Sequence, residues 1–203
     1  MDELRTEIVR LFQQGSHIAH DEKHALRVAA LAKYIATTED YDTDEAEVAG
    51  LLHDMGRTVQ DEEKGHGPAG VPLATKLLDE YTSFGAAAKE RIVRAVAEHS
   101  GLHTEGKLTH IVQDADMIDG LGAIGLARAY TSKAQLPDYD PANIVPTKGV
   151  RDTNIHDQIA FQMEWLNFMH TTAGQRIAQK RYDFMKQFLE TFRDEASAAD
   201  LAP

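Results

Sequence analysis

Four short segments carry histidines and carboxylates at spacings that suit a metal ion. In the first of them, His20 and His24 are four residues apart, so they share one face of a helix. Imidazole and carboxylate are ligands for Mn, Fe, Co, Ni and Zn, and carboxylate also suits Mg. The segments therefore predict a divalent metal site; they are HDEKH (20–24), HDMGR (53–57), EHSGLH (98–103) and QDADMID (113–119).

The adjacent pair His53 and Asp54 follows the apolar run VAGLL, which predicts a buried helix end. Neighbouring side chains on an ideal helix point about 100° apart, so both reach one ion only if the ion lies between their directions. Burying such a pair is costly unless it binds a metal or is hydrogen-bonded. The alternative interpretation is a His–Asp hydrogen bond that caps the helix.

Composition narrows the classes of function. The chain has no cysteine, which excludes disulfides, thiolate metal sites and cysteine nucleophiles. Its 21 basic and 33 acidic residues give a formal net charge of −12, which disfavours a nucleic-acid scaffold as partner. We find no signal peptide and no apolar run long enough for a membrane span. These features predict a cytoplasmic protein.

Apolar residues recur at helical spacing almost everywhere, and no convincing alternating strand is present. The fold class expected from this pattern is all-α. Beyond a first helix that ends at Gly15, the expected helices include 21–37, 86–99, 108–118, 121–130, 153–169 and 172–196.

Several residues predict helix ends. Thr43 or Asp44 is expected as the N-cap of the helix that leads to His53, and Gly56 as its left-handed C-terminal stop. Pro68 is expected to begin the next helix. Gly122 and Gly125 weaken a short helix by propensity, so close packing against a neighbour is expected there.

The segment 131–152 contains three prolines in PDYDPANIVPTKG and no periodic stripe, which predicts a long surface loop or lid. We expect a single domain over 1–203, with a core over about 1–130 and a C-terminal helical pair over 153–196. Apolar stripes on that pair, such as Phe184, Phe188 and Phe192, predict core packing or the surface of a homodimer.

The order H … HD … D, together with longer blocks, resembles the HD-domain metal-dependent phosphohydrolases, specifically a subgroup of small bacterial hydrolases. The resemblance covers nearly the whole chain and implies an HD-domain helical bundle. The blocks that carry it are HDEKHALRV (20–28), LLHDMGR (51–57), HGPAG (66–70), EHS (98–100), QDADMIDGLGAIGLARAY (113–130) and TTAGQRIAQKRYDFMKQFLETF (171–192).

Carried over position by position, the resemblance implies one divalent ion per chain (Mn, Mg, Ni, Co, Fe or Zn). Its implied ligands are His24, His53, Asp54 and Asp116. Asp114 and Asp119 flank the last ligand and are expected to orient it or to contact water and substrate.

Two further histidines, His66 and His99, loosely match positions that hold a second metal in some relatives. The alternative is that they line the pocket and contact a phosphate.

The expected chemistry is hydrolysis by a metal-activated water. The catalytic residues implied are Asp54, Arg57, His99 and Asp119; substrate binding is assigned to Arg57, His66, His99 and Arg128. A guanidinium matches phosphate oxygens bidentately, although an ordinary surface ion pair is an equal alternative for Arg57. The proton donor to the leaving group is left open among His99, His66 and Asp119.

The function expected is therefore a phosphohydrolase acting on a small phosphorylated substrate, such as a nucleotide or another phosphate ester. A non-catalytic, metal-binding regulatory protein of the HD fold is the main alternative, and a di-iron oxygenase is a third. The segment 154–169 lacks a lysine that the subgroup leads us to expect there. The second dipeptide of the same kind, His156 and Asp157, has no partners in order and is interpreted as accidental.

Overall fold

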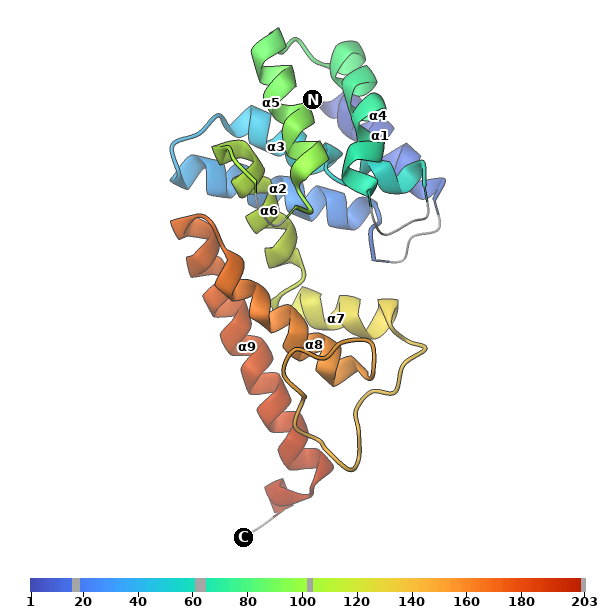
Figure 1. Ribbon diagram of the computed structural model, residues 1–203, viewed down its shortest axis with the longest axis vertical. Helices are drawn as coiled ribbons and strands as arrows, with labels where there is room; N and C mark the ends of the chain where they lie inside the picture. The colour runs from blue at the N-terminus through green and yellow to red at the C-terminus, as the bar shows by residue number, and fades with distance from the viewer. Residues whose placement is uncertain (16–18, 61–64, 102–103, 202–203) are drawn as a thin grey trace. The chain divides into compact units, whose positions relative to one another are not determined.

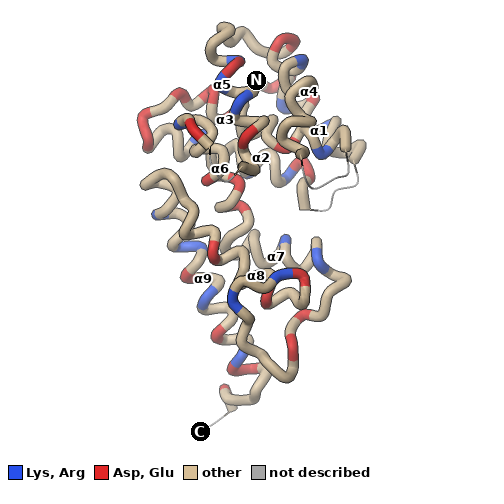
Figure 2. The backbone as a smooth tube through the Cα atoms, in the orientation of Figure 1, with Lys and Arg blue, Asp and Glu red and all other residues tan. Residues whose placement is uncertain are grey.

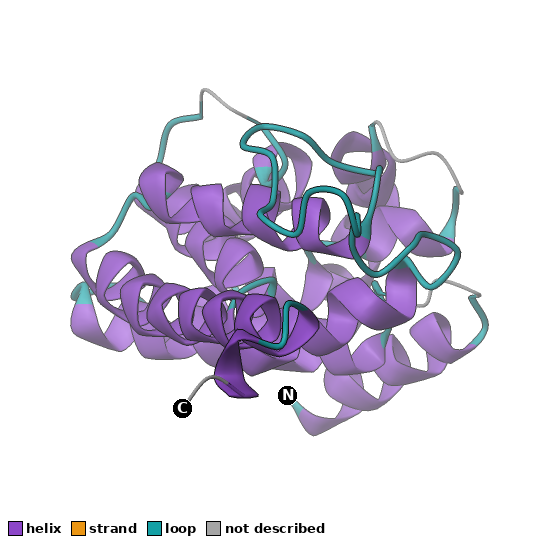
Figure 3. Ribbon diagram, turned by 90° about the horizontal axis from the view of Figure 1, so that it is seen from below, coloured by secondary structure: helices purple, strands orange, loops and turns teal. Residues whose placement is uncertain are grey.

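A computed structural model describes residues 1–15, 19–60, 65–101 and 104–201. Over these residues the chain is all-α, as predicted, with nine α-helices and no β-strand (Figure 3). The helices belong to two compact units. The first contains Met1–Asp116 and His170–Gly174, and the second Met117–Met169 and Gln175–Pro203. That the whole chain forms one HD domain stays a prediction.

The first unit is built around two packed helix pairs, α2 with α3 and α4 with α5 (Figure 1). It also holds most of α6 and the first residues of α9. The bounds of these elements are α1 Asp2–Gln13, α2 Glu22–Thr38, α3 Thr43–Leu52, the 3₁₀ helix η1 Met55–Thr58, α4 His66–Tyr81, α5 Ala86–Glu98, α6 Lys107–Asp119 and α9 Thr172–Ala196.

Small residues bring α2 and α3 close together. Ala25, Ala29 and Ala32 are fully or almost fully buried on α2, and a Cβ on Gly50 would lie 2.8 Å from the Cα of Ala29. Such interdigitated packing gains dispersion energy and removes apolar surface from water. It also brings His24, in the first turn of α2, beside the end of α3.

The expected N-cap of α3 is wrong by one or two positions. Asp42, rather than Thr43 or Asp44, accepts hydrogen bonds on Oδ1 from the backbone N–H groups of Asp44 and Glu45, at 3.0 and 2.9 Å. A carboxylate is a strong N-cap acceptor, and Asp42 directly precedes the two expected residues. Glu47, three residues after Asp44, is buried and pairs with Lys33 at 2.6 Å.

Gly56 is not a left-handed helix stop. Helix α3 ends at Leu52, and Gly56 is absent from the residues with positive φ. Helix α4 occupies the space that a side chain at position 56 would need, because a Cβ on Gly56 would collide with the carbonyl of His66. A Cβ on Gly70 would likewise lie 2.7 Å from the Gly56 nitrogen. The two glycines thus allow η1 and α4 to touch, which brings His66 to the HDMGR segment.

Helix α4 begins two residues before Pro68. Gly65, with φ +84°, turns the chain so that His66 is the first helical residue. Pro68 then occupies the first turn, where its missing N–H is not needed.

The second unit contains α7, α8 and the rest of α9, with 3₁₀ segments η2 and η3; their bounds are α7 Gly122–Ser132, α8 Ile155–Met163, η2 Glu164–Phe168 and η3 Ala199–Leu201. A helix was expected over 153–169, but α8 ends at Met163 and continues as η2. The expected close packing is present at Gly122, where a Cβ would lie 3.0 Å from Arg181 Cγ of α9. At Gly125 a Cβ would instead collide with the carbonyl of Gly120, in the turn before the helix.

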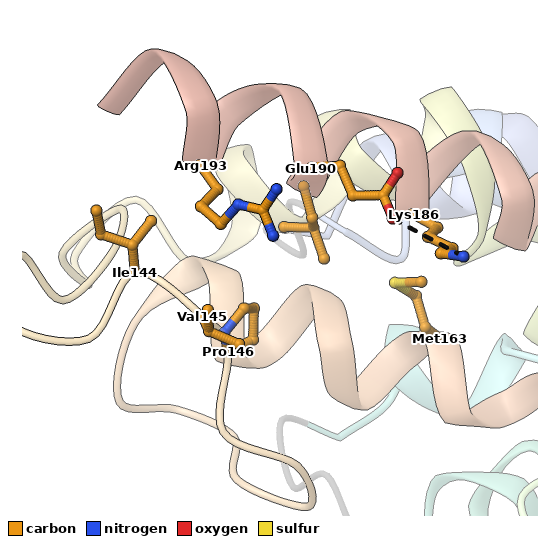
Figure 4. A pocket seen from close by; sticks show the side chains of 8 residues that line it. Ile144, Val145, Pro146, Met163, Lys186, Glu190 and Arg193 are labelled. Atoms are coloured by element: carbon orange, nitrogen blue, oxygen red, sulfur yellow. Dashed lines mark ion pairs between the residues drawn. The ribbon is translucent and has the colours of Figure 1, made fainter. Parts of the chain in front are cut away.

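No helix interrupts the chain between α7 and α8, as expected for the loop. Its residues Ile144, Val145 and Pro146 face α9 across a cavity of about 140 Å³ (Figure 4). Met163 of α8 closes one side, and α9 contributes Lys186, Leu189, Glu190 and Arg193. The loop is therefore packed against helices of its own unit at this point.

Acidic residues outnumber basic ones along the chain, as the formal charge requires (Figure 2). Within the described residues, no helix combines the length and hydropathy that crossing a membrane needs.

Candidate metal centre

All four ligands predicted from the resemblance lie together in the first unit. The Nε2 atoms of His24 and His53 are 3.2 Å apart, and Asp116 Oδ1 lies 3.2 Å from His24 Nε2 and 3.8 Å from His53 Nε2. Asp54 Oδ2 lies 3.5 Å from each of the two Nε2 atoms. Donor atoms from α2, the end of α3, its following turn and α6 thus lie close together, with both carboxylate oxygens within 3.8 Å of each Nε2 atom.

The backbone at the end of α3 allows the adjacent residues His53 and Asp54 to direct their side chains to the same place. His53 is the C-cap and keeps helical angles, but Asp54 has φ −99° and ψ 15°. The chain has left the helix at Asp54, so the two side chains no longer need to point about 100° apart. Both are almost fully buried, with exposed fractions of 0 and 1 %.

The hydrogen bonds of His53 determine which nitrogen faces the cluster. Its Nδ1 lies 2.7 Å from the carbonyl oxygen of Gly50, which can only accept, so Nδ1 carries the proton. In the neutral ring Nε2 then presents a lone pair toward His24, Asp54 and Asp116. A backbone carbonyl that holds one ring nitrogen while the other binds metal is the usual arrangement around a histidine ligand.

The separations between donor atoms match those around one ion. Bonds of about 2.0–2.1 Å to a metal place neighbouring ligands about 2.9 Å apart at right angles and about 3.4 Å apart in a tetrahedron. Five of the six separations within the set, all except that between the two carboxylate oxygens, run from 3.2 to 3.8 Å. The cluster therefore has the donor types and the spacing to hold a divalent ion.

The electrostatics of the cluster keep its ligands in the metal-binding protonation states. Burial lowers the pKa of His53 to about 4, against the opposing charges of Asp54 and Asp116. Burial alone would raise the pKa of Asp54, but the surrounding histidines, His53 first, hold it well below its usual range. Burial opposes ionisation of Asp116 too, but the hydrogen bond with His24 and the charges of His53 and His24 together outweigh burial and lower the pKa. Neutral imidazole beside ionised carboxylate is what a metal requires.

The other oxygen of Asp54 faces a second group of side chains. His66 Nε2 and His99 Nε2 lie 3.4 and 3.5 Å from Asp54 Oδ1 and 2.9 Å from each other. Arg57 donates from Nε to the same oxygen at 3.1 Å. His99 Nδ1 is held by the carbonyl of Val96 at 2.8 Å, which leaves its Nε2 directed at this group. The structure thus brings Arg57, His66 and His99 to the predicted metal ligands.

His99 differs from His53 in its charge balance. Burial lowers the pKa of its imidazole, but the hydrogen bond and negative charge of Asp54 outweigh burial and raise it above the ordinary value. The pKa values of His53 and His99 are therefore shifted in opposite directions.

Asp119 and Arg128 belong to the second unit, where Arg128 Nη1 donates to Asp119 Oδ2 at 2.9 Å. Their expected roles in catalysis and substrate binding stay predictions. Asp114 was expected to orient the fourth ligand or to contact water and substrate, and this stays a prediction. In the structure its carboxylate accepts from the backbone N–H groups of His170 and Thr171, both at 2.8 Å. It thus holds the start of α9.

One close neighbour of Asp54 was not among the predicted site residues. His20 Nδ1 lies 2.6 Å from Asp54 Oδ2. The i, i+4 spacing of His20 and His24 marked both residues in the sequence, but only His24 matched the ligand order. His103, in the EHSGLH segment, lies outside the described residues.

A search of family models matches residues 22–122 to the HD domain. This range begins at α2 and contains each of His24, His53, Asp54 and Asp116. The chain is an HD-domain protein. HD domains bind divalent metals, and the His–Asp clusters of this HD-domain protein suit that chemistry.

Relatives of this HD-domain protein extend over its whole length. The uncharacterised protein YpgQ of Bacillus subtilis is 26 % identical over 210 residues, covering 98 % of this chain and 95 % of YpgQ. An HD-superfamily hydrolase from Bacillus thuringiensis superposes with a TM-score of 0.77 at 26 % identity, covering 97 % of this chain and 96 % of the other. A crystal structure of YpgQ in complex with ADP superposes with a TM-score of 0.75 at 24 % identity, covering 96 % of each chain.

A further match is local. Ribonuclease Y of Pelobacter propionicus is 34 % identical over 115 residues, which are 56 % of this chain but 20 % of the ribonuclease. Together these relatives support membership of a hydrolase superfamily.

Proposed function

We propose that this HD-domain protein is a metal-dependent phosphohydrolase that acts on a nucleotide or another small phosphate ester. The observation that carries the proposal is the convergence of His24 Nε2, His53 Nε2, Asp54 Oδ2 and Asp116 Oδ1, with neighbouring donors 3.2–3.8 Å apart. When bound, a divalent ion supplies Lewis acidity toward a phosphoryl oxygen and makes a water more acidic.

The residues around that centre would orient substrate and handle protons. Arg57 uses its Nε–H for Asp54, so its Nη hydrogens are the donors for phosphate oxygens. His66 and His99, on the Oδ1 side of Asp54, would hold the proton for the leaving oxygen. The side chain of Asp116 is 30 % exposed, which leaves one side of the cluster open to a substrate.

A small substrate is favoured over a polynucleotide. The formal charge of −12 repels an extended phosphate backbone, whereas one nucleotide meets only the local field of Arg57 and the ion. YpgQ, a relative over the whole length, has been crystallised with ADP. We therefore propose nucleoside phosphates as the first substrates to test.

The number of ions is the point at which two versions of the mechanism differ. One ion per chain needs only the Oδ2 side of Asp54. A second ion would take Asp54 Oδ1, His66 Nε2 and His99 Nε2, which lie 2.9–3.5 Å apart. A measured stoichiometry of one keeps the two histidines for substrate and proton, and a stoichiometry of two assigns them to the second ion.

The decisive experiment uses purified protein that has been stripped of metal and reloaded with Mn, Mg, Co, Ni or Fe. Bound metal is measured by elemental analysis, and phosphate release is measured with ADP, other nucleotides and a generic phosphomonoester. We expect metal-dependent phosphate release that His53→Ala abolishes. Lys148→Ala, in the exposed loop between α7 and α8, is the matched control and should act as the wild type.

Two other outcomes would overturn the proposal. Bound metal without hydrolysis of any phosphate would favour the regulatory interpretation. Absence of metal under every loading condition would reject the ligand assignment.

A further inference from the structure

His20 stands apart from the predicted ligands in its distance to Asp54. Its Nδ1 lies 2.6 Å from Asp54 Oδ2, whereas the Nε2 atoms of His24 and His53 both lie 3.5 Å from the same oxygen. The three histidines therefore approach one carboxylate oxygen in two different ways.

The difference has a geometric reason. Two ligands of one ion, each about 2.0–2.1 Å from it, are separated by about 2.9 Å or more. A nitrogen at 2.6 Å from Asp54 Oδ2 is too close to be a second ligand of the ion that this oxygen binds, and has the length of a strong N–H···O⁻ hydrogen bond. His24 and His53, at 3.5 Å, have the separation of co-ligands.

We infer that His20 is a positioning residue, which donates from Nδ1–H to Asp54 and orients its carboxylate for the ion. This inference rests on the proposed metal-dependent function. Arg57 donates to the other oxygen, Oδ1, at 3.1 Å, so the carboxylate is held at both oxygens by groups that are not ligands. Asp54 can then direct Oδ2 to His24 and His53, and Oδ1 to His66 and His99.

The location of His20 in the chain suits this role. It directly precedes Asp21, whose Oδ1 accepts from the backbone N–H of His24 at 2.9 Å and caps α2. The start of α2 thus carries a metal ligand, His24, close to the residue that positions a second ligand, Asp54. The side chain of His20 is 28 % exposed, in contrast to the fully buried His24, so its replacement leaves the core intact.

The test measures Mn²⁺ binding by titration calorimetry, with no substrate present, in the wild type, His20→Ala, His20→Asn and His24→Ala. Groups that orient a ligand typically contribute 10- to 100-fold to metal affinity. We expect His20→Ala to bind as many ions as the wild type with an affinity weaker by about 10- to 100-fold. His20→Asn should recover part of that loss, because its amide N–H can replace Nδ1–H, and His24→Ala should lose the ion.

The matched control is His110→Ala. His110 is a partly buried histidine of the same unit, whose Nε2 bonds to the carbonyl of Thr104 at 3.0 Å, away from Asp54. It should bind Mn²⁺ as the wild type does. Unchanged affinity in His20→Ala would overturn the inference, and so would the loss of a whole ion, which would make His20 a ligand.

The failure of this inference differs from the failure of the proposed function. A wild type that binds Mn²⁺ but releases phosphate from no substrate would contradict the hydrolase proposal, while the affinities still decide the role of His20. A wild type that binds no Mn²⁺ would overturn both.

Discussion

The chain contains two buried His–Asp pairs with opposite surroundings. His53 and Asp54 stand at the end of α3, and His156 and Asp157 stand in the first turn of α8. All four side chains are at least nine-tenths buried. The dipeptide and its burial are therefore shared, and the difference lies in what each carboxylate meets.

Asp157 meets hydrogen-bond donors of its own segment. Its Oδ1 accepts from the backbone N–H of Thr147 at 2.7 Å, and its Oδ2 accepts from Thr153 Oγ1 at 2.6 Å and Asn154 Nδ2 at 2.7 Å. Each oxygen is satisfied by neutral donors, and the bonds connect the long loop to the start of α8. Asp157 is thus a structural acceptor with no need of an ion.

Asp54, by contrast, meets nitrogen atoms of its neighbour His53 and of histidines from elements far apart in sequence. His24 and His53 face its Oδ2, and His66 and His99 face its Oδ1. Lone pairs that converge in this way are favourable only when a cation or protons stand between them. A buried His–Asp pair is therefore a metal-site indicator only when histidines from other elements surround it.

The largest expected effect comes from removing the charge of Asp54. Asp54→Asn should abolish metal binding and lower turnover by about 10³-fold or more, because several kcal/mol of transition-state stabilisation depend on the ion. Elemental analysis and phosphate release measure it. Asp157→Asn is the matched substitution, and it should retain the metal content of the wild type. Equal loss of metal in Asp54→Asn and Asp157→Asn would contradict the proposal that only the His53–Asp54 pair binds metal.

Arg57→Ala should lower kcat/KM by about 10- to 100-fold, because a charge-assisted hydrogen bond contributes about 1.5–3 kcal/mol. Metal should remain bound, since Arg57 is not a ligand. The kcat/KM of Arg57→Lys should lie between those of Arg57→Ala and the wild type, because lysine keeps the charge but lacks the planar guanidinium. Steady-state kinetics on the best substrate test this prediction. An unchanged kcat/KM in Arg57→Ala would show that Arg57 forms an ordinary ion pair and does not bind substrate.

Asp157→Ala should destabilise the fold by about 1–3 kcal/mol, because it leaves buried donors without an acceptor and removes a contact that fixes the loop. For a protein of this size that is a fall in Tm of roughly 3–10 °C. Thermal unfolding followed by circular dichroism measures it, with metal content as the second measurement. A Tm equal to that of the wild type would contradict the structural role of Asp157.

The smallest expected effect concerns pH. Burial lowers the pKa of His156, and its ring packs 4.2 Å from that of Phe192, centroid to centroid. Because its pKa is lower in the folded than in the unfolded chain, protonation favours unfolding, and stability falls as pH drops from 7 to 5. His156→Phe should reduce that fall by less than about 1 kcal/mol.

The measurement is Tm at pH 5, 6 and 7 with a chelator present, so that metal release does not contribute. His110→Phe serves as the control. An identical pH dependence in His156→Phe and the wild type would show that His156 does not titrate with unfolding.

Much of the fold was readable from the sequence. The bounds of α9, expected over 172–196, are those of the structure, and α2 and α5 agree within one residue. Apolar periodicity determines such helices because burial acts along one face of each. Ends were less predictable: the cap at Asp42 and the role of Gly56 depend on hydrogen bonds and close approaches that periodicity does not encode.

The sequence by itself determined which donor atoms are available for a metal and, through their order, the family of the chain. The tertiary structure alone decided which of them meet. His24, His53 and Asp116 are separated by dozens of residues, so their distances depend on how α2, α3 and α6 pack rather than on local spacing. For the same reason only the structure distinguishes Asp54, which imidazoles surround, from Asp157, which accepts hydrogen bonds from donors near the start of its own helix. Only the structure, likewise, shows His20 at hydrogen-bonding distance from Asp54.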